Sequence, residues 1–86
     1  MILEKEKAML LFKMAKRKGG LWGGKYDRLE HFKRFNIDVI KELSKISWII
    51  IYKKDKFTGI SLNPKYKKEI IEFVEIQLPY LKGVLK

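Results

Sequence analysis

The sequence predicts a small α+β domain that is mainly helical and carries one β-hairpin. Three observations support this fold class. Apolar residues recur at helical spacing in the first half of the chain. A β-branched and aromatic run follows residue 46, and helical spacing returns after Pro64. With 86 residues, 47% of them hydrophobic, the chain suits one folded domain over residues 1–86.

Three helices are predicted before the hairpin. The first covers residues 3–18 and stops at Gly19, the second covers Tyr26–Phe35, and Asn36 caps the third over Ile37–Ile46. Each helix has an apolar face that is expected to point inward. The inward residues are Ala8, Leu11, Phe12 and Ala15; Leu29, Phe32 and Phe35; and Val39, Ile40, Leu43 and Ile46.

The second half of the chain is predicted to hold a hairpin and a final helix. Trp48–Lys53 is expected to pair with Gly59–Leu62, because both runs have strand composition and turn residues lie between them. Asn63 is a suitable cap for a helix over residues 64–78, with Pro64 in its first turn. Pro79 is expected to end or kink that helix, and a short apolar tail follows it.

Charge is unevenly distributed along the chain. The net charge is +10, and residues 47–68 alone carry six basic residues and one acidic residue. Residues 69–86 carry two basic and three acidic residues and are strongly apolar. The basic part predicts a polyanionic partner, whereas the C-terminal part predicts packing or contact with another chain.

The order of elements resembles that of the winged helix-turn-helix family. The stretch "VIKELSKISWIIIYKKDKFTGISLNPKYKKEIIEFVE" resembles a recognition helix, a wing and the helix that follows. "ISLNP" before a helix is similar to the closing strand of many small prokaryotic, especially archaeal, regulators. The resemblance implies a cytoplasmic transcription regulator that binds double-stranded DNA as a homodimer. The Lys- and Ile-rich composition also favours a thermophilic source.

Candidate DNA contacts lie on the predicted second and third helices and at the hairpin tip. Lys41, Ser44 and Lys45 are off the buried stripe of the third helix, where they would reach bases or phosphates; the alternative is a solvated face with Asp38–Lys41 and Glu42–Lys45 pairs. The tip lysines would contact phosphates or simply protect a strand edge. The full predicted set is Arg28, Arg34, Lys41, Ser44, Lys45, Lys53, Lys54 and Lys56.

The C-terminal segment, residues 64–86, is predicted to form a dimerisation helix. Its apolar surface exceeds what an 86-residue core is expected to absorb, so a second copy is the predicted partner. The alternative is that the helix closes the core of a single chain against the first helix. The predicted dimer residues are Ile70, Phe73, Val74, Gln77, Leu78 and Leu81.

Several functions are excluded by composition or spacing. "GGLWGGKY" at residues 19–26 nearly matches a phosphate-binding loop, but Tyr26 replaces the required Ser or Thr and a helix precedes the loop. This stretch is therefore predicted to be a joint anchored by Leu21 and Trp22, with no bound nucleotide. The absence of cysteine and the presence of one histidine argue against a metal or cofactor site, and no nucleophile–base arrangement indicates an enzyme.

Alternative functions use the same surface differently. A non-specific architectural or segregation-type protein would bind DNA without sequence preference. A protein-interaction module of a replication or plasmid-maintenance complex would use its basic face only for solubility. No apolar run is long enough for a membrane span, and no signal-peptide pattern is present, so neither a membrane nor export is expected.

Overall fold

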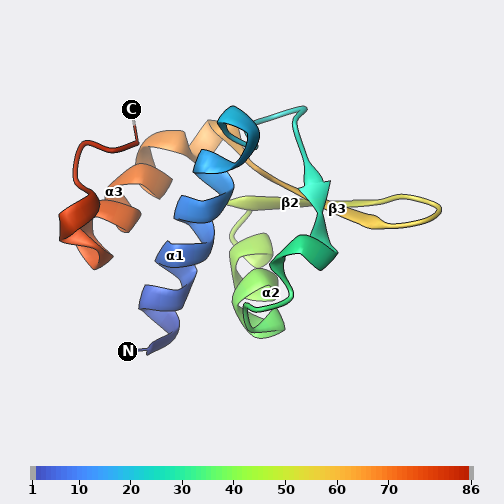
Figure 1. Cartoon of the computed structure of the whole chain (residues 1–86), viewed down its shortest axis with the longest axis horizontal. Helices are drawn as coiled ribbons and strands as arrows, with labels where there is room; N and C mark the ends of the chain where they lie inside the picture. The colour runs from blue at the N-terminus through green and yellow to red at the C-terminus, as the bar shows by residue number, and fades with distance from the viewer. Residues whose placement is uncertain (1, 86) are drawn as a thin grey trace.

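The computed structural model describes residues 2–85, with side chains described from Glu4 onward, and is an α+β fold with three helices and a three-stranded sheet (Figure 1). The helices are α1 (Ile2–Lys16), α2 (Ile37–Lys45) and α3 (Lys67–Gln77). The strands are β1 (Asp27–Arg28), β2 (Ile49–Lys53) and β3 (Thr58–Leu62). The α+β class predicted from the sequence is confirmed.

The sheet is antiparallel with the order β1-β3-β2. The hairpin pairs Ile51 with Ile60 and Tyr52 with Gly59, and β1 adds to the other edge of β3 by pairing Arg28 with Gly59. The hairpin projects from one end of the molecule, and α3 with the C-terminal segment lies at the other end (Figure 1). The molecule is elongated as a result, with extents of 39 × 25 × 20 Å.

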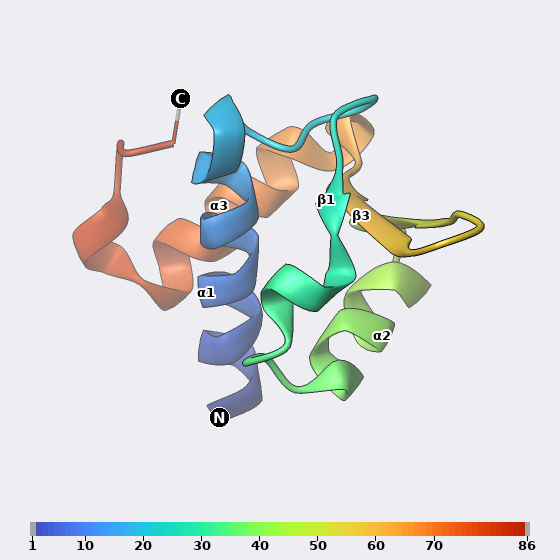
Figure 2. The same cartoon turned by 45° about the vertical axis from the view of Figure 1, so that its right-hand side comes forward.

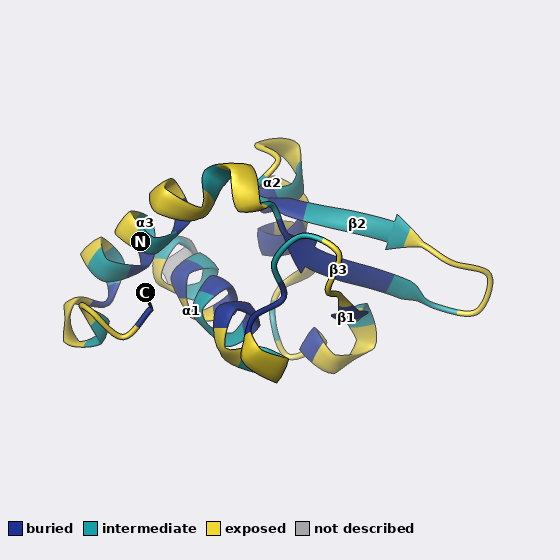
Figure 3. Ribbon diagram, turned by 90° about the horizontal axis from the view of Figure 1, so that it is seen from above, coloured by how far each residue is buried: buried dark blue, intermediate teal, exposed yellow. Residues whose placement is uncertain are grey.

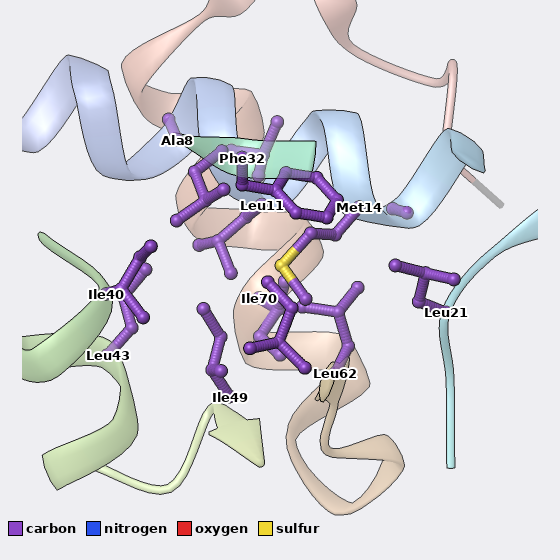
Figure 4. Packing of buried hydrophobic residues seen from close by; sticks show 14 of the residues in the cluster. Ala8, Leu11, Met14, Leu21, Phe32, Ile40, Leu43, Ile49, Leu62 and Ile70 are labelled. Atoms are coloured by element: carbon purple, nitrogen blue, oxygen red, sulfur yellow. The ribbon is translucent and has the colours of Figure 1, made fainter. Parts of the chain in front are cut away.

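The core lies where α1 meets α2, α3 and the sheet. Figure 4 shows Leu11 and Met14 of α1 close to Phe32, Leu62 and Ile70. All five of these side chains are fully buried, so each stabilises the fold by roughly 1.5–3 kcal/mol relative to an exposed position. α1 is thus the central helix, and every other element packs against it directly or through this core.

The predicted second helix is wrong in type and length. Residues 27–28 are extended and form β1, and only a single 3₁₀ turn, Leu29–Phe32, follows. Pairing with β3 holds this segment extended, and the buried Asp27 carboxylate accepts the Arg28 N–H at 2.8 Å. Propensity over ten residues predicted a helix, but contacts from distant parts of the chain overrule such local preferences.

α2 begins as predicted and ends one residue early. The Asn36 side chain accepts the Asp38 N–H at 2.8 Å, which confirms the cap. Ile46, which was predicted to be buried, follows the last helical residue and is 52% exposed. The chain turns there through Ser47 at φ 67°, which directs Ile46 away from the core while Trp48 and Ile49 enter the hairpin.

The C-terminal helix also differs in detail from the prediction. Asn63 caps a 3₁₀ turn, Pro64–Tyr66, and the α-helix proper begins at Lys67. The helix ends at Gln77, and Pro79 opens a further 3₁₀ turn, as the proline predicted. No helix in the described part of the chain is long and apolar enough to cross a membrane.

The segment 19–26 is anchored rather than mobile. Leu21 is buried, its N–H donates to Met14 O at 3.1 Å, and its carbonyl accepts the Leu62 N–H at 2.6 Å. Gly20 is at φ 108°, and a Cβ there would lie 2.8 Å from the Trp22 ring. The predicted anchoring by Leu21 and Trp22 is confirmed. The segment connects α1 to β1, so it lacks the strand-loop-helix order of a phosphate cradle.

Candidate nucleic-acid interface

The exposed face of α2 carries two lysines, Lys41 and Lys45, that form no ion pair with any residue the structure describes. Asp38, Lys41, Glu42 and Lys45 are exposed, and Ser44 is half-buried. The Asp38–Lys41 and Glu42–Lys45 pairs that would make this an ordinary solvated face do not occur among the residues the structure describes; Glu42 instead binds Lys7 of α1 at 2.8 Å. Lys41 and Lys45 therefore remain available to an external anion.

The Lys7–Glu42 pair affects both pKa values. The hydrogen bond from Lys7 lowers the pKa of Glu42, and the same bond is the largest effect raising the pKa of Lys7. Lys7 also contacts Glu4 at 3.1 Å. One of the two acidic groups on the α2 face is thus neutralised by α1, which weakens the repulsion that this face would exert on a phosphate backbone.

The hairpin tip, Lys53–Lys56, is the most exposed basic feature of the sheet (Figure 3). Its turn is closed by the Lys54 N–H, which donates to Phe57 O at 2.9 Å. Across the described residues, none of the three tip lysines forms an ion pair. Three cations on a projecting turn match the geometry that proteins use to reach a phosphate backbone.

An aromatic cluster of Tyr26, Tyr52 and Phe57 lies at the base of the tip. The ring centroids of Tyr26 and Tyr52 are 5.3 Å apart, and those of Tyr26 and Phe57 are 6.1 Å apart. Gly59 makes room for the cluster, because a Cβ there would lie only 2.8 Å from the Tyr26 ring. Tyr52 and Phe57 thus pack on Tyr26 at the hairpin, in keeping with the aromatic composition of this part of the chain. The contribution of Tyr26 was missed, because it was assigned to a helix.

Two cations rest on this aromatic cluster. The Arg28 guanidinium lies 4.7 Å from the Phe57 centroid, and the Lys54 ammonium lies 5.4 Å from that of Tyr26. Such contacts contribute about 0.5–1 kcal/mol each at exposed sites. They restrict long side chains that would otherwise lose more entropy on binding. Arg28 and Lys54 are therefore partly preorganised, whereas Lys53 and Lys56 extend freely from the tip.

Buried Asp27 connects three elements beneath this surface. Its carboxylate binds Arg17 and lies 3.6 Å from Lys18 Nζ and 2.9 Å from His31 Nδ1. Burial alone would raise the pKa of Asp27, but hydrogen bonds from His31 and Arg17 outweigh it and hold that pKa well below its usual value. This network fixes the end of α1 to β1 and so determines where Arg28 lies.

His31, to which no role was assigned from the sequence, contacts the Asp27 carboxylate. The sequence signal was the four-residue spacing from Asp27, since side chains four residues apart lie close together on a helical segment. The 3₁₀ turn brings the His31 ring onto the Asp27 carboxylate, and Arg17 Nη2 lies 3.1 Å from His31 Nδ1. Within the described residues no group of three His, Cys, Asp or Glu side chains is arranged for a metal ion.

Arg34 lies apart from the other predicted DNA contacts. It borders a groove formed by α1 and the C-terminal segment, with Met9, Lys16 and Tyr80. The other seven residues lie on β1, α2 and the hairpin, elements that are joined through the sheet and through direct packing of α2 on β2. Seven of the eight predicted contacts thus lie on elements that pack together, and Arg34 lies outside them.

The predicted dimer residues divide into two groups. Ile70, Val74 and Leu78 are buried in the core of the single chain, so a partner cannot contact them without opening that core. The Phe73 ring packs edge-on against Trp48 at 5.6 Å. Gln77 and Leu81 are half-buried. This arrangement corresponds to the alternative given from the sequence, in which the C-terminal helix closes the core of a single chain against α1.

Comparison with known proteins adds no relatives to this description. No family model matches the chain, and no curated protein or solved structure matches it either.

Proposed function

We propose that this protein is a winged-helix transcription regulator that binds double-stranded DNA as a homodimer. In this proposal α2 is the recognition helix and the β2–β3 hairpin is the wing. The observation that supports it best is the basic surface of α2, β1 and the hairpin, whose cations have no acidic partner among the described residues.

The topology supports the proposal. A helix, a short strand, a turn, a second helix and a two-stranded hairpin follow one another, and the short strand pairs with the returning strand of the hairpin. A winged helix-turn-helix has this order, except that a full helix usually stands where this chain has the 3₁₀ turn Leu29–Phe32. The recognition helix is nine residues long, about two and a half turns.

The mechanism follows from how each cation is held. Arg28 and Lys54, restricted by aromatic rings, set the register of the hairpin on the phosphate backbone. Lys53 and Lys56 add mobile phosphate contacts from the tip. Lys41, Ser44 and Lys45 of α2 enter the major groove, where lysine and serine donate to base edges or phosphates. The Asp27 network keeps β1, and with it Arg28, in place relative to α1.

The first test is the binding of a labelled random-sequence duplex over a salt series. A DNA-binding face predicts that log affinity falls linearly with log salt, with a slope of about −0.9 for each phosphate contacted. Absence of binding at low salt would contradict the proposal and would favour a protein-interaction module.

Selection from a random duplex library then distinguishes a sequence-specific regulator from an architectural DNA binder. A regulator is expected to prefer one sequence over random DNA by about 10³-fold or more. Equal affinity for all sequences would contradict the regulator and leave an architectural or segregation-type DNA binder. The regulator and the architectural DNA binder are therefore distinguished by one experiment on the same protein preparation.

A further inference from the structure

A groove runs along α1 on the side of the molecule away from the hairpin. It has a volume of about 730 Å³ and is lined by α1, Arg34 and Phe35, and the C-terminal turn with Leu78, Tyr80 and Leu81. Figure 2 shows the course of α1 and of the C-terminal segment beside it. The floor of the groove is apolar, formed mainly by Met9, Phe12, Phe35 and Leu81. It is open to solvent along its length, so an elongated element fits it better than a small enclosed ligand.

The rim of this α1 groove is basic. Lys13, Lys16, Arg17 and Arg34 line it, with Glu6 as the one acidic residue among its lining. Two of these groups are already engaged: Arg17 binds Asp27, and the Glu6 carboxylate accepts the Asn36 N–H at 2.6 Å.

The remaining cations of the rim are less constrained. Lys13 lies over the rings of Phe32 and Phe35. Lys16 and Arg34 are exposed and form no ion pair within the described part of the chain. The groove is therefore an apolar trough with unneutralised positive charge at its edge.

The outward face of α3 has the complementary character. Glu69, Glu72 and Ile76 are exposed and lie three and four residues apart, on one face of the helix. We call these three residues the acidic stripe. Ile76 is 72% exposed, and Tyr80, which follows the helix and borders the α1 groove, is 76% exposed. A large apolar side chain exposed to the degree of Ile76 on the same helix face as two carboxylates indicates a contact surface rather than a solvated one.

We infer that the α1 groove binds the acidic stripe and Tyr80 of a second copy of this chain. The inference rests on the homodimer of the proposed function and replaces the interface predicted from the sequence, whose central residues are buried in the core. In a two-fold dimer each chain supplies one groove and one stripe, so the same contact forms twice. Lys16 and Arg34 pair with Glu69 and Glu72 of the partner, and Ile76 and Tyr80 cover the apolar floor.

A second copy is favoured over other occupants by what the chain itself carries. Both complementary surfaces are present on one molecule, and two of its exposed large apolar side chains, Met9 and Tyr80, line the groove. α1 and the C-terminal segment, which line the groove, are also remote from the hairpin tip in Figure 1. Dimerisation here leaves the proposed wings of both chains free to contact DNA.

Charge exchange between two variants tests this inference. The groove variant is Lys16→Glu/Arg34→Glu and the stripe variant is Glu69→Lys/Glu72→Lys. Each variant alone places like charges across both copies of the contact, which costs several kcal/mol, so the dimer Kd is expected to rise on the order of 10²-fold or more. An equimolar mixture places opposite charges across both contacts and is expected to restore dimers.

Molar mass by light scattering over a concentration series is the readout, with circular dichroism to verify folding. Lys53→Glu/Lys56→Glu is the matched control: it is expected to dimerise normally and to lose DNA affinity. A wild-type chain that stays monomeric, variants that still dimerise, or a mixture that stays monomeric would each overturn the inference. A monomer that binds duplex DNA would refute this interface without refuting DNA binding, because the two readouts are separate.

Discussion

The hairpin end and the α1–α3 end of this molecule expose two different kinds of surface. At the hairpin end, exposed cations surround a small aromatic cluster and have no acidic partner among the described residues. At the α1–α3 end, an apolar groove with a basic rim lies close to an acidic helix face. The first surface suits a uniformly negative polymer, and the second suits a partner with both apolar and acidic groups. In the two proposals, positive charge therefore serves DNA binding at the hairpin end and self-association at the α1–α3 end.

The largest expected effect is the loss of duplex affinity when the charge of the hairpin tip is reversed. Lys53→Glu/Lys56→Glu replaces two positive charges of the hairpin tip by two negative ones, and duplex affinity is expected to fall on the order of 10²-fold, with a shallower salt slope. Lys5→Glu/Lys82→Glu makes the same change in net charge at exposed positions away from the tip. Fluorescence anisotropy on one duplex compares them. Equal losses would mean that net charge alone, and not the hairpin, governs binding.

The next effect concerns the network that supports the hairpin end. Asp27→Asn keeps the shape of the side chain but leaves Arg17 without its counter-ion, so the free energy of unfolding is expected to fall by about 2 kcal/mol. This is below the value for a fully buried pair because the Arg17 side chain is 32% exposed. Urea unfolding measures it, with Asp55→Asn at the exposed tip as a control expected to change stability by less than about 0.5 kcal/mol.

Wild type and Asp27→Asn are also expected to differ in how their free energy of unfolding depends on pH. The folded state holds the pKa of Asp27 below its unfolded value. The unfolded chain therefore binds the proton first as the pH falls below about 4, and stability falls with it. The stability difference between wild type and Asp27→Asn should be complete at neutral pH and shrink in acid. A difference that stays constant down to pH 3 would show that the carboxylate charge is not what stabilises the fold.

The smallest effect concerns the aromatic cluster. Gly59→Ala places a methyl group against the Tyr26 ring, which has to move, at an expected cost of about 1 kcal/mol in stability. Gly24→Ala is the matched control, since nothing lies within 4 Å of a Cβ there. Thermal unfolding compares the two. If Gly59→Ala also weakens duplex binding severalfold while Gly24→Ala does not, the ring contacts that hold Arg28 and Lys54 contribute to the interface.

The parts of the fold that were predicted correctly are those governed by neighbours in sequence. The cap at Asn36, the apolar spacing of α2, the strand composition on both sides of the hairpin tip and the stop at Pro79 all act within a few residues. The candidate interface followed from the same local features, because the tip lysines and the exposed lysines of α2 are placed by helix and strand periodicity alone.

The errors occurred where a residue's position depends on a distant part of the chain. Tyr26 and Asp27 have no local feature that predicts a strand, and β1 exists because β3 offers an open edge. Ile46 continues the spacing of α2 but falls one residue beyond its end, and the turn into the hairpin exposes it.

By itself, the sequence determined the α+β class, the basic character of α2 and the hairpin tip, and the strands of the hairpin to within one residue, because periodicity, turn chemistry and charge are local properties. The tertiary structure alone decided that Asp27 is buried against Arg17, Lys18 and His31, that Ile70, Val74 and Leu78 are buried in the core of the single chain, and that Tyr80 beside α1 remains exposed. The physical reason is that burial depends on which surfaces meet. When a helix is apolar on several sides, its sequence does not predict which side packs against its own chain and which side remains exposed for a partner.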